Sequence, residues 1–131
     1  MRILIILMLV IAVPSVVMFS GCDRDKEVPE ENLRVTTDAV NNSEIPGATY
    51  DFNLTVESVM PRNGVGISIN VVGESDNRNY SPVPDIETFN KTTTIHLSGL
   101  PLQQYSLVGI RVTSKTKNTN TVTLSFRVIR K

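Results

Sequence analysis

Residues 50–57 read YDFNLTVE, and this short stretch decides the fold. Tyr50, Phe52, Leu54 and Val56 fall on one side of an extended chain, and the polar residues between them fall on the other. Side chains alternate between the two faces of a β-strand, so this period of two is typical of a strand with one buried face. The stretch therefore predicts a strand that covers a hydrophobic core.

The same pattern recurs along the rest of the chain. Residues 65–71, 92–97, 105–112 and 122–128 are rich in β-branched and apolar side chains, and turn-forming residues separate them. No stretch beyond residue 22 carries a sustained period of 3.6 residues. The chain is therefore predicted to be an all-β, antiparallel sandwich of six to seven strands.

Three details accompany this prediction. Ile86 and Phe89 are assigned to a short edge strand, and residues 114–120 to a hairpin loop. The inward phase of the strand that begins near Tyr105 changes between Leu107 and Val108. A β-bulge beside Gly109 is the expected cause, because an extra residue shifts the alternation by one.

The residues at the start of the chain have a different composition from this domain. Met1 and Arg2 are followed by an apolar run over residues 3–13 and a second one over residues 16–19, and five charged residues occupy positions 23–27. A basic start, an apolar centre and small residues before a polar switch are typical of a secretory signal peptide. Residues 1–21 are therefore predicted to be a signal peptide.

Cys22 is the only cysteine and follows Phe19-Ser20-Gly21. At this point the sequence resembles the lipobox of bacterial lipoproteins, although Phe19 stands where Leu is commonest. The resemblance implies that Cys22 is acylated and becomes the first residue of a membrane-anchored protein, and two or three acyl chains hold a protein stably. Two alternatives remain: an uncleaved transmembrane anchor and a secreted protein with a free thiol.

The charged residues after Cys22 resemble the surface-export signal of Bacteroidetes lipoproteins. This implies a location in the cell envelope, at the periplasmic or surface face of the outer membrane. Residues 22–46 hold few apolar side chains and are predicted to be a largely flexible tether. Within them Leu33, Val35 and Thr37 alternate as a short first strand would. The sandwich domain is assigned to residues 47–131.

One segment makes the prediction of the fold more specific. Residues 94–107, TIHLSGLPLQQYSL, resemble the corner between two strands of fibronectin type III domains, in which Pro precedes Tyr by four residues, as Pro101 precedes Tyr105 here. The resemblance implies an immunoglobulin-like sandwich of the fibronectin III type, in which the Tyr105 hydroxyl bonds back across the corner. It covers roughly the last 40 residues, and the tryptophan typical of that family is absent, since the chain contains no Trp.

The charges exclude one class of function. The chain holds 13 basic and 13 acidic residues, and only Arg2 of these lies in the predicted leader. Such a balance gives no general attraction to nucleic acid. All charged residues after residue 100 are nevertheless basic, so one end of the fold is expected to be positive. Arg111, Lys115 and Lys117 are the candidate ligand contacts, for an anionic glycan or an envelope protein.

The sequence contains no arrangement that favours catalysis. His96 is the only histidine, and it is expected on the surface of a strand. No spacing selects a nucleophile for it, and no cysteine, histidine or glycine motif indicates a metal or a cofactor. The leading hypothesis is a non-enzymatic binding or adhesion module, with loops 73–84 and 114–120 as the expected sites. The alternative is a structural accessory of a larger envelope assembly, and a small hydrolase is disfavoured.

Overall fold

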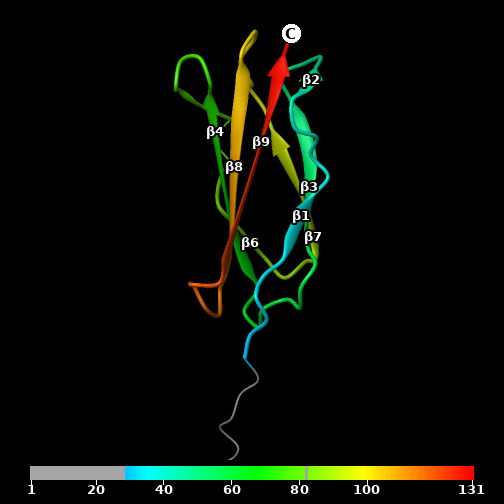
Figure 1. Ribbon diagram of the computed structural model, residues 1–131, viewed down its shortest axis with the longest axis vertical. Helices are drawn as coiled ribbons and strands as arrows, with labels where there is room; N and C mark the ends of the chain where they lie inside the picture. Colours follow the sequence, from blue (N-terminus) through cyan, green and yellow to red (C-terminus); the bar gives the residue numbers. More distant parts are fainter. Residues whose placement is uncertain (1–28, 82) are drawn as a thin grey trace, which may run out of the picture.

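The computed structural model describes residues 29–81 and 83–131, which form nine strands and no α-helix (Figure 1). None of these residues therefore belongs to a helix long and apolar enough to cross a membrane. Cys22, the predicted signal peptide 1–21 and residues 22–28 of the predicted tether lie outside the described residues. The strands, in chain order, are β1 (Val35–Thr37), β2 (Ser43–Ile45), β3 (Tyr50–Val56), β4 (Val65–Gly73), β5 (Asn79–Tyr80), β6 (Ile86–Thr88), β7 (Thr92–Leu97), β8 (Tyr105–Ser114) and β9 (Thr121–Arg130).

The strands form two sheets that face each other. One sheet has the order β1-β3-β7, and the other has the order β2-β9-β8-β4-β5, with β6 paired to β4 as well. In Figure 1 the smaller sheet lies on the right, β8 and β4 of the larger sheet lie on the left, and β9 crosses between them toward β2 at the upper right. The predicted all-β, immunoglobulin-like sandwich is confirmed. Two details differ from the prediction: the strands are nine, and β2 runs parallel to β9, so the pairing is not wholly antiparallel.

The core lies between the sheets and follows from the alternation. In β3 the inward Phe52, Leu54 and Val56 are at most 4% exposed. Phe52 meets Phe126 of β9 edge-to-face, with ring centroids 5.0 Å apart, which is a favoured geometry for aromatic pairs. Ile95 and Leu97 of β7 lie on the same side, each 1% exposed. The six-stranded sheet contributes ten buried apolar residues to the core: Ile45, Val65, Ile67, Ile69, Val71, Val108, Ile110, Val112, Phe126 and Val128.

The bulge predicted beside Gly109 is wrong. β8 pairs with β4 and with β9 in unbroken register, and Gly109 faces Asn70 and Ser125. Leu107 is 44% exposed, because it belongs to the outward face of β8. The apolar character of one outward leucine therefore produced the apparent change of phase.

The predicted domain boundary at residue 47 is also corrected, since the described part of the tether, residues 29–46, contributes to the sandwich. Leu33, Val35 and Ile45 are each less than 9% exposed and belong to the core. β1 pairs with β3, which confirms the short first strand over these residues. Three apolar side chains suffice to fix this segment because each of them is buried.

The corner after β7 differs from the expected one. Among the described residues, no partner hydrogen-bonds the Tyr105 hydroxyl. The corner is instead held by Leu100, which is 1% exposed. Its N–H donates to the Ala48 carbonyl at 3.0 Å, and its carbonyl accepts from Nη1 of Arg130 at 3.0 Å. The fold is thus shared with the expected class, whereas the tyrosine corner is not formed.

Candidate binding groove

Arg111 lies on the outer face of the six-stranded sheet. Val108, Ile110 and Val112 of β8 point into the core, so the residues between them point away from it. On the neighbouring strand β4, Ser68 lies opposite Arg111 and Gly66 lies opposite Thr113. The outward side chains of β4 are therefore small where they meet the cationic side chain.

A groove of about 330 Å³ follows this line of small residues. Its floor is at Gly66 and Ser68. One wall is β6, where Glu87 lies opposite Gly66 in the register. The other wall carries Arg111 and Lys115. A Cβ at Gly66 would lie 3.6 Å from Cδ of Lys115, so the lysine stem passes close to the bare backbone.

The two predicted contacts in the groove differ in their electrostatic state. Nζ of Lys115 lies 2.7 Å from Oε2 of Glu87, so this cation already has a partner. Within the described residues, Arg111 has neither an ion pair nor a side-chain hydrogen bond. Asp85 lines the same groove. With two cations and two acids the groove is near neutral overall, and Arg111 is the cation that remains available to a ligand.

Lys117, the third predicted contact, does not join them. It lines a separate depression together with Glu30, Leu33 and Asn120, at the end of the hairpin. The structure therefore brings together Arg111 and Lys115 but not Lys117.

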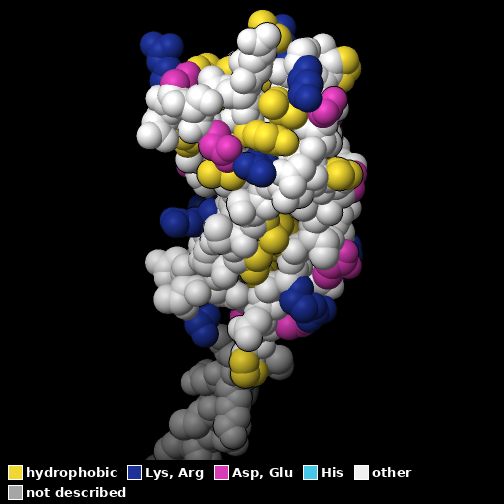
Figure 2. Space-filling view, turned by 45° about the horizontal axis from the view of Figure 1, so that its top comes forward, with side chains coloured by type: hydrophobic (Ala, Val, Ile, Leu, Met, Phe, Trp, Pro, Cys, Tyr) yellow, Lys and Arg dark blue, Asp and Glu magenta, His cyan; other side chains and the backbone are white. Residues whose placement is uncertain are grey.

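The expected positive end of the fold is partly neutralised, since three of the six basic residues after residue 100 have an acidic partner among the described residues. Besides Lys115, two other cations after residue 100 find acids from distant segments: Arg127 pairs with Glu74 at 3.0 Å, and Lys131 pairs with Glu44 at 3.1 Å. Figure 2 shows cationic and acidic side chains side by side over the visible face. An excess of basic residues in one part of the sequence therefore need not give a positively charged surface in the fold.

The polar loop that begins at residue 73 is closed by its own contacts. Asp76 accepts hydrogen bonds from the Tyr80 hydroxyl, the Arg78 N–H and Nε2 of Gln104. These bonds, above all that from Tyr80, hold the pKa of Asp76 below its ordinary 3.8, and the same pair raises the pKa of Tyr80 above 10.0. The carboxylate is thus already occupied, and no cluster of three metal-ligating side chains exists among the described residues.

His96 lies on the surface of β7, as predicted. Its Nδ1 is 3.0 Å from Oδ1 of Asp51, and the two side chains are 71% and 61% exposed. They face each other because Asp51 and His96 are register partners in β3 and β7. The sequence placed both residues outward, but their pairing depends on the register, which no local pattern reveals. Among the described residues no hydroxyl hydrogen-bonds His96, so the pair lacks a nucleophile.

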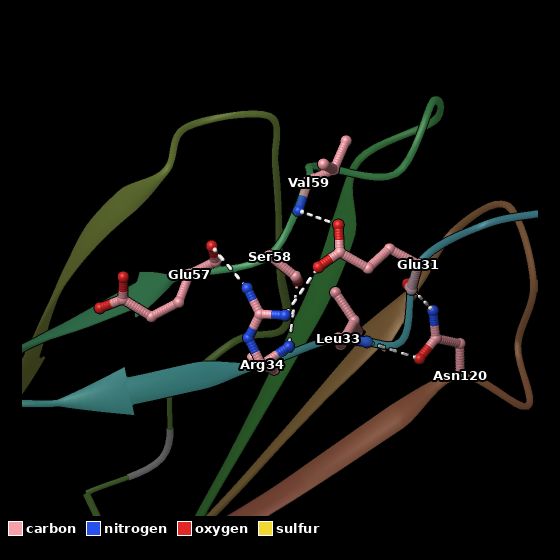
Figure 3. A network of polar contacts seen from close by, with 7 residues as sticks. All are labelled: Glu31, Leu33, Arg34, Glu57, Ser58, Val59 and Asn120. Carbon is pink, nitrogen blue, oxygen red and sulfur yellow. Dashed lines mark hydrogen bonds and ion pairs between the residues drawn. The ribbon is translucent and has the colours of Figure 1, made fainter.

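The segment that leads into β1 is tied to the loop between β3 and β4 (Figure 3). Nη1 of Arg34 lies 2.7 Å from Oε2 of Glu31, and the N–H of Val59 donates to Oε1 of Glu31 at 3.3 Å. The bond from Arg34, followed by that from Val59, lowers the pKa of Glu31 below its ordinary 4.5. The backbone N–H of Arg34 also donates to Oγ of Ser58 at 3.0 Å.

Asn120 ties the same segment to the β8–β9 hairpin. Its Oδ1 accepts from the Leu33 N–H at 2.9 Å, and its Nδ2 donates to Oε2 of Glu30 at 2.6 Å and to the Glu31 carbonyl at 3.0 Å. Ser114, 1% exposed, donates to Oε1 of Glu30 at 3.0 Å. The first described residues are therefore fixed at the end of the sandwich that carries this hairpin (Figure 1).

Fold and contacts together define an immunoglobulin-like β-sandwich with an open groove on its larger sheet, lined by both charged and apolar side chains. No family model matches the sequence, and no curated protein matches it either. Among solved structures, the chain is similar to the solution structure of a conjugate transposon protein (residues 27–141) from Bacteroides vulgatus. The TM-score is 0.51 at 11% identity, over 78% of this chain and 88% of that one.

A second similar structure is the ASH/PapD-like domain 7 of human CEP192. Its TM-score is 0.45 at 12% identity, over 81% of this chain and 88% of that one. At such identities the likeness to the transposon protein concerns the fold. Function has to be argued from the residues of this chain.

Proposed function

We propose that this protein is a lipoprotein of the bacterial cell envelope whose sandwich is a non-enzymatic binding module. Acyl chains on Cys22 anchor it in the outer membrane, and its ligand binds in the groove between β6 and β8. The observation that carries the proposal is the position of Arg111: an unpaired guanidinium, within the described residues, beside a floor of small residues.

The groove suits an extended, polar ligand that carries negative charge. Arg111 offers a planar set of donors that matches a carboxylate or a sulfate group. Ser68 and Thr113 supply hydroxyl groups, and Asp85 accepts hydrogen bonds from ligand hydroxyls. An acidic polysaccharide combines these features. Because a single exposed cation supplies the charge, binding is weak and depends on salt.

The anchoring is supported by the sequence around Cys22. The similarity to a conjugate transposon protein from Bacteroides vulgatus concerns the fold, so the anchoring depends on these residues alone.

A structural accessory role is the second candidate, and β7 supplies the observation that favours it. In the described residues β7 pairs with β3 alone, so its other edge is open to a partner. An open edge can accept a strand from another protein through main-chain hydrogen bonds.

Binding to dextran sulfate, with uncharged dextran as the matched polymer, tests the groove. Wild-type protein is expected to bind dextran sulfate and not to bind dextran. Arg111→Ala should weaken binding about fivefold, the effect of roughly 1 kcal/mol. Arg62→Ala removes a second exposed arginine that has no ion pair in the described residues, and it should change binding less than about twofold.

Gly66→Leu fills the groove without removing a charge. Gly66 has no strained backbone, and nothing lies closer than 3.6 Å to its added Cβ, so the fold should persist. Its binding should fall at least as far as that of Arg111→Ala. Equal binding by wild type, Arg111→Ala and Gly66→Leu would place the site elsewhere. Absence of any dextran sulfate binding would favour the accessory role.

A further inference from the structure

One end of the sandwich, here called the N-terminal pole, gathers four segments: residues 29–34, 57–64, 89–91 and 115–120. Besides the contacts of Glu31 and Asn120, the loops are joined by backbone bonds. The Val56 N–H donates to the Lys91 carbonyl at 2.8 Å, and the Lys115 N–H donates to the Gly64 carbonyl at 2.9 Å. The pole is therefore one continuous surface, at the opposite end from the C-terminus (Figure 1).

Two apolar side chains project from this surface. Val59 is 69% exposed and Phe89 is 68% exposed. They belong to neighbouring loops, because the Phe89 ring lies 3.3 Å from the position of a Cβ on Gly64. Exposed apolar side chains that gather on one surface within a polar rim can mark a site of contact with a membrane or a protein.

Cationic side chains accompany them. Arg62, Lys91 and Lys117 are exposed and have no ion pair within the described residues. The pole also carries acids, which are engaged: Glu31 pairs with Arg34, and Glu30 accepts from Ser114 and Asn120. With Glu57, which accepts from the Thr36 hydroxyl, the four segments hold three acidic and five basic residues. This excess is small, so electrostatic attraction alone would hold the surface to a partner only weakly.

The number of residues between Cys22 and the described domain limits how far this surface can lie from the membrane. Only six residues lie between Cys22 and Pro29, so seven Cα–Cα steps join the two. Fully extended, they span at most roughly 25 Å. β8 alone, with ten residues, spans roughly 30 Å, so the opposite pole lies much farther from Cys22. If Cys22 is acylated, the N-terminal pole is held within a short distance of the lipid headgroups.

We propose that the N-terminal pole rests on the membrane surface, with Val59 and Phe89 in the headgroup region and Arg62, Lys91 and Lys117 around them. The inference rests on the proposed acylation of Cys22. Apolar and aromatic tips favour the membrane interface, and cations near them meet lipid phosphates. The tether raises the local concentration of the surface, so weak contacts suffice.

The absence of tryptophan from the chain makes a sharp test possible. Phe89→Trp introduces a single fluorophore at the N-terminal pole, and Leu102→Trp introduces one at the opposite pole, where Leu102 is 56% exposed. Each mature lipoprotein is reconstituted in vesicles of phosphatidylethanolamine and phosphatidylglycerol, with and without lipids brominated near the headgroup. We expect a blue-shifted emission and at least about twofold quenching for Phe89→Trp, and neither for Leu102→Trp. Val59→Trp should repeat the result of Phe89→Trp.

The outcomes separate the two claims. Protein that floats with the vesicles while Phe89→Trp and Val59→Trp stay unquenched would overturn the docked pole and leave the anchor intact. Equal quenching of Leu102→Trp would also overturn it, because the domain would then contact the membrane with both poles and have no preferred orientation. Protein that does not float with the vesicles would overturn the anchor, and the docking with it.

Discussion

The guanidinium of Arg127 lies over the ring of Tyr105, with its central carbon 4.1 Å from the ring centroid. Arg127 also binds both carboxylate oxygens of Glu74, at 3.1 and 3.0 Å. The ring of Tyr105 is thus a platform for a cation that joins β9 to the loop after β4. This contact, rather than a hydroxyl bond across the corner, explains the aromatic residue at this position.

Substitutions at Tyr105 distinguish the ring from the hydroxyl. Tyr105→Phe keeps the ring and should change the free energy of unfolding by less than about 0.5 kcal/mol. Tyr105→Leu removes the cation–π contact and should cost about 1 kcal/mol. Urea unfolding of the two variants and wild type measures both. A loss of more than 1 kcal/mol in Tyr105→Phe would show that the hydroxyl is bonded, as the fibronectin-like corner implied.

Asn120 should be among the more sensitive polar residues of the described chain. Asn120→Ala leaves the Leu33 N–H and the Glu31 carbonyl without their partner in a part-buried site, which should cost about 2 kcal/mol. Asn118→Ala, in the same hairpin loop, removes an exposed side chain with no hydrogen bond among the described residues and should cost less than about 0.5 kcal/mol. Comparable urea midpoints for the two variants would contradict the role of Asn120.

The contacts of Asp76 predict a pH-dependent contribution to stability. Its folded pKa is lowered, so the stability that it contributes is present above the ordinary value of 3.8 and is lost as the pH falls through the folded value. The raised pKa of Tyr80 has the opposite consequence: its contribution is present below 10.0 and is lost as the pH rises further. Asp76→Asn should therefore lower the urea midpoint at pH 7, and the difference from wild type should shrink toward pH 2.

A matched variant controls for the loss of charge. Asp85→Asn removes an exposed acid that has no hydrogen bond within the described residues, so its midpoint should follow that of wild type from pH 2 to pH 7. If Asp76→Asn and Asp85→Asn behave alike, the network around Asp76 contributes nothing measurable.

Much of the fold could be predicted from the sequence, because alternation is a local signal. Phe52, Leu54 and Val56 are buried as their spacing requires. The same rule misled at Leu107, since an outward position on a strand can hold an apolar residue when little contacts it. It was also too strict for residues 29–46, where few apolar residues occur but those present are buried.

The site was less predictable, because it depends on which strands become neighbours. Arg111 lies on β8 and Lys115 directly follows its last residue, so their closeness was visible in the sequence. The partner of Lys115 is Glu87, which lies 28 residues away along the chain and reaches it across β4. Asp51 and His96 meet in the same way through the register of β3 and β7. Such pairs require the register, and only the folded sheet supplies it.

The anchored envelope protein is the central claim, and the intact mass of the chain from the membrane fraction of cells tests it most directly. The account predicts a protein that begins at Cys22 and carries a diacylglyceryl group on its sulfur, with a further acyl chain on its amine. After Cys22→Ser the protein should no longer be acylated or matured in this way. Recovery of a wild-type chain that retains residues 1–21, or of one with an unmodified Cys22 thiol, would contradict the claim.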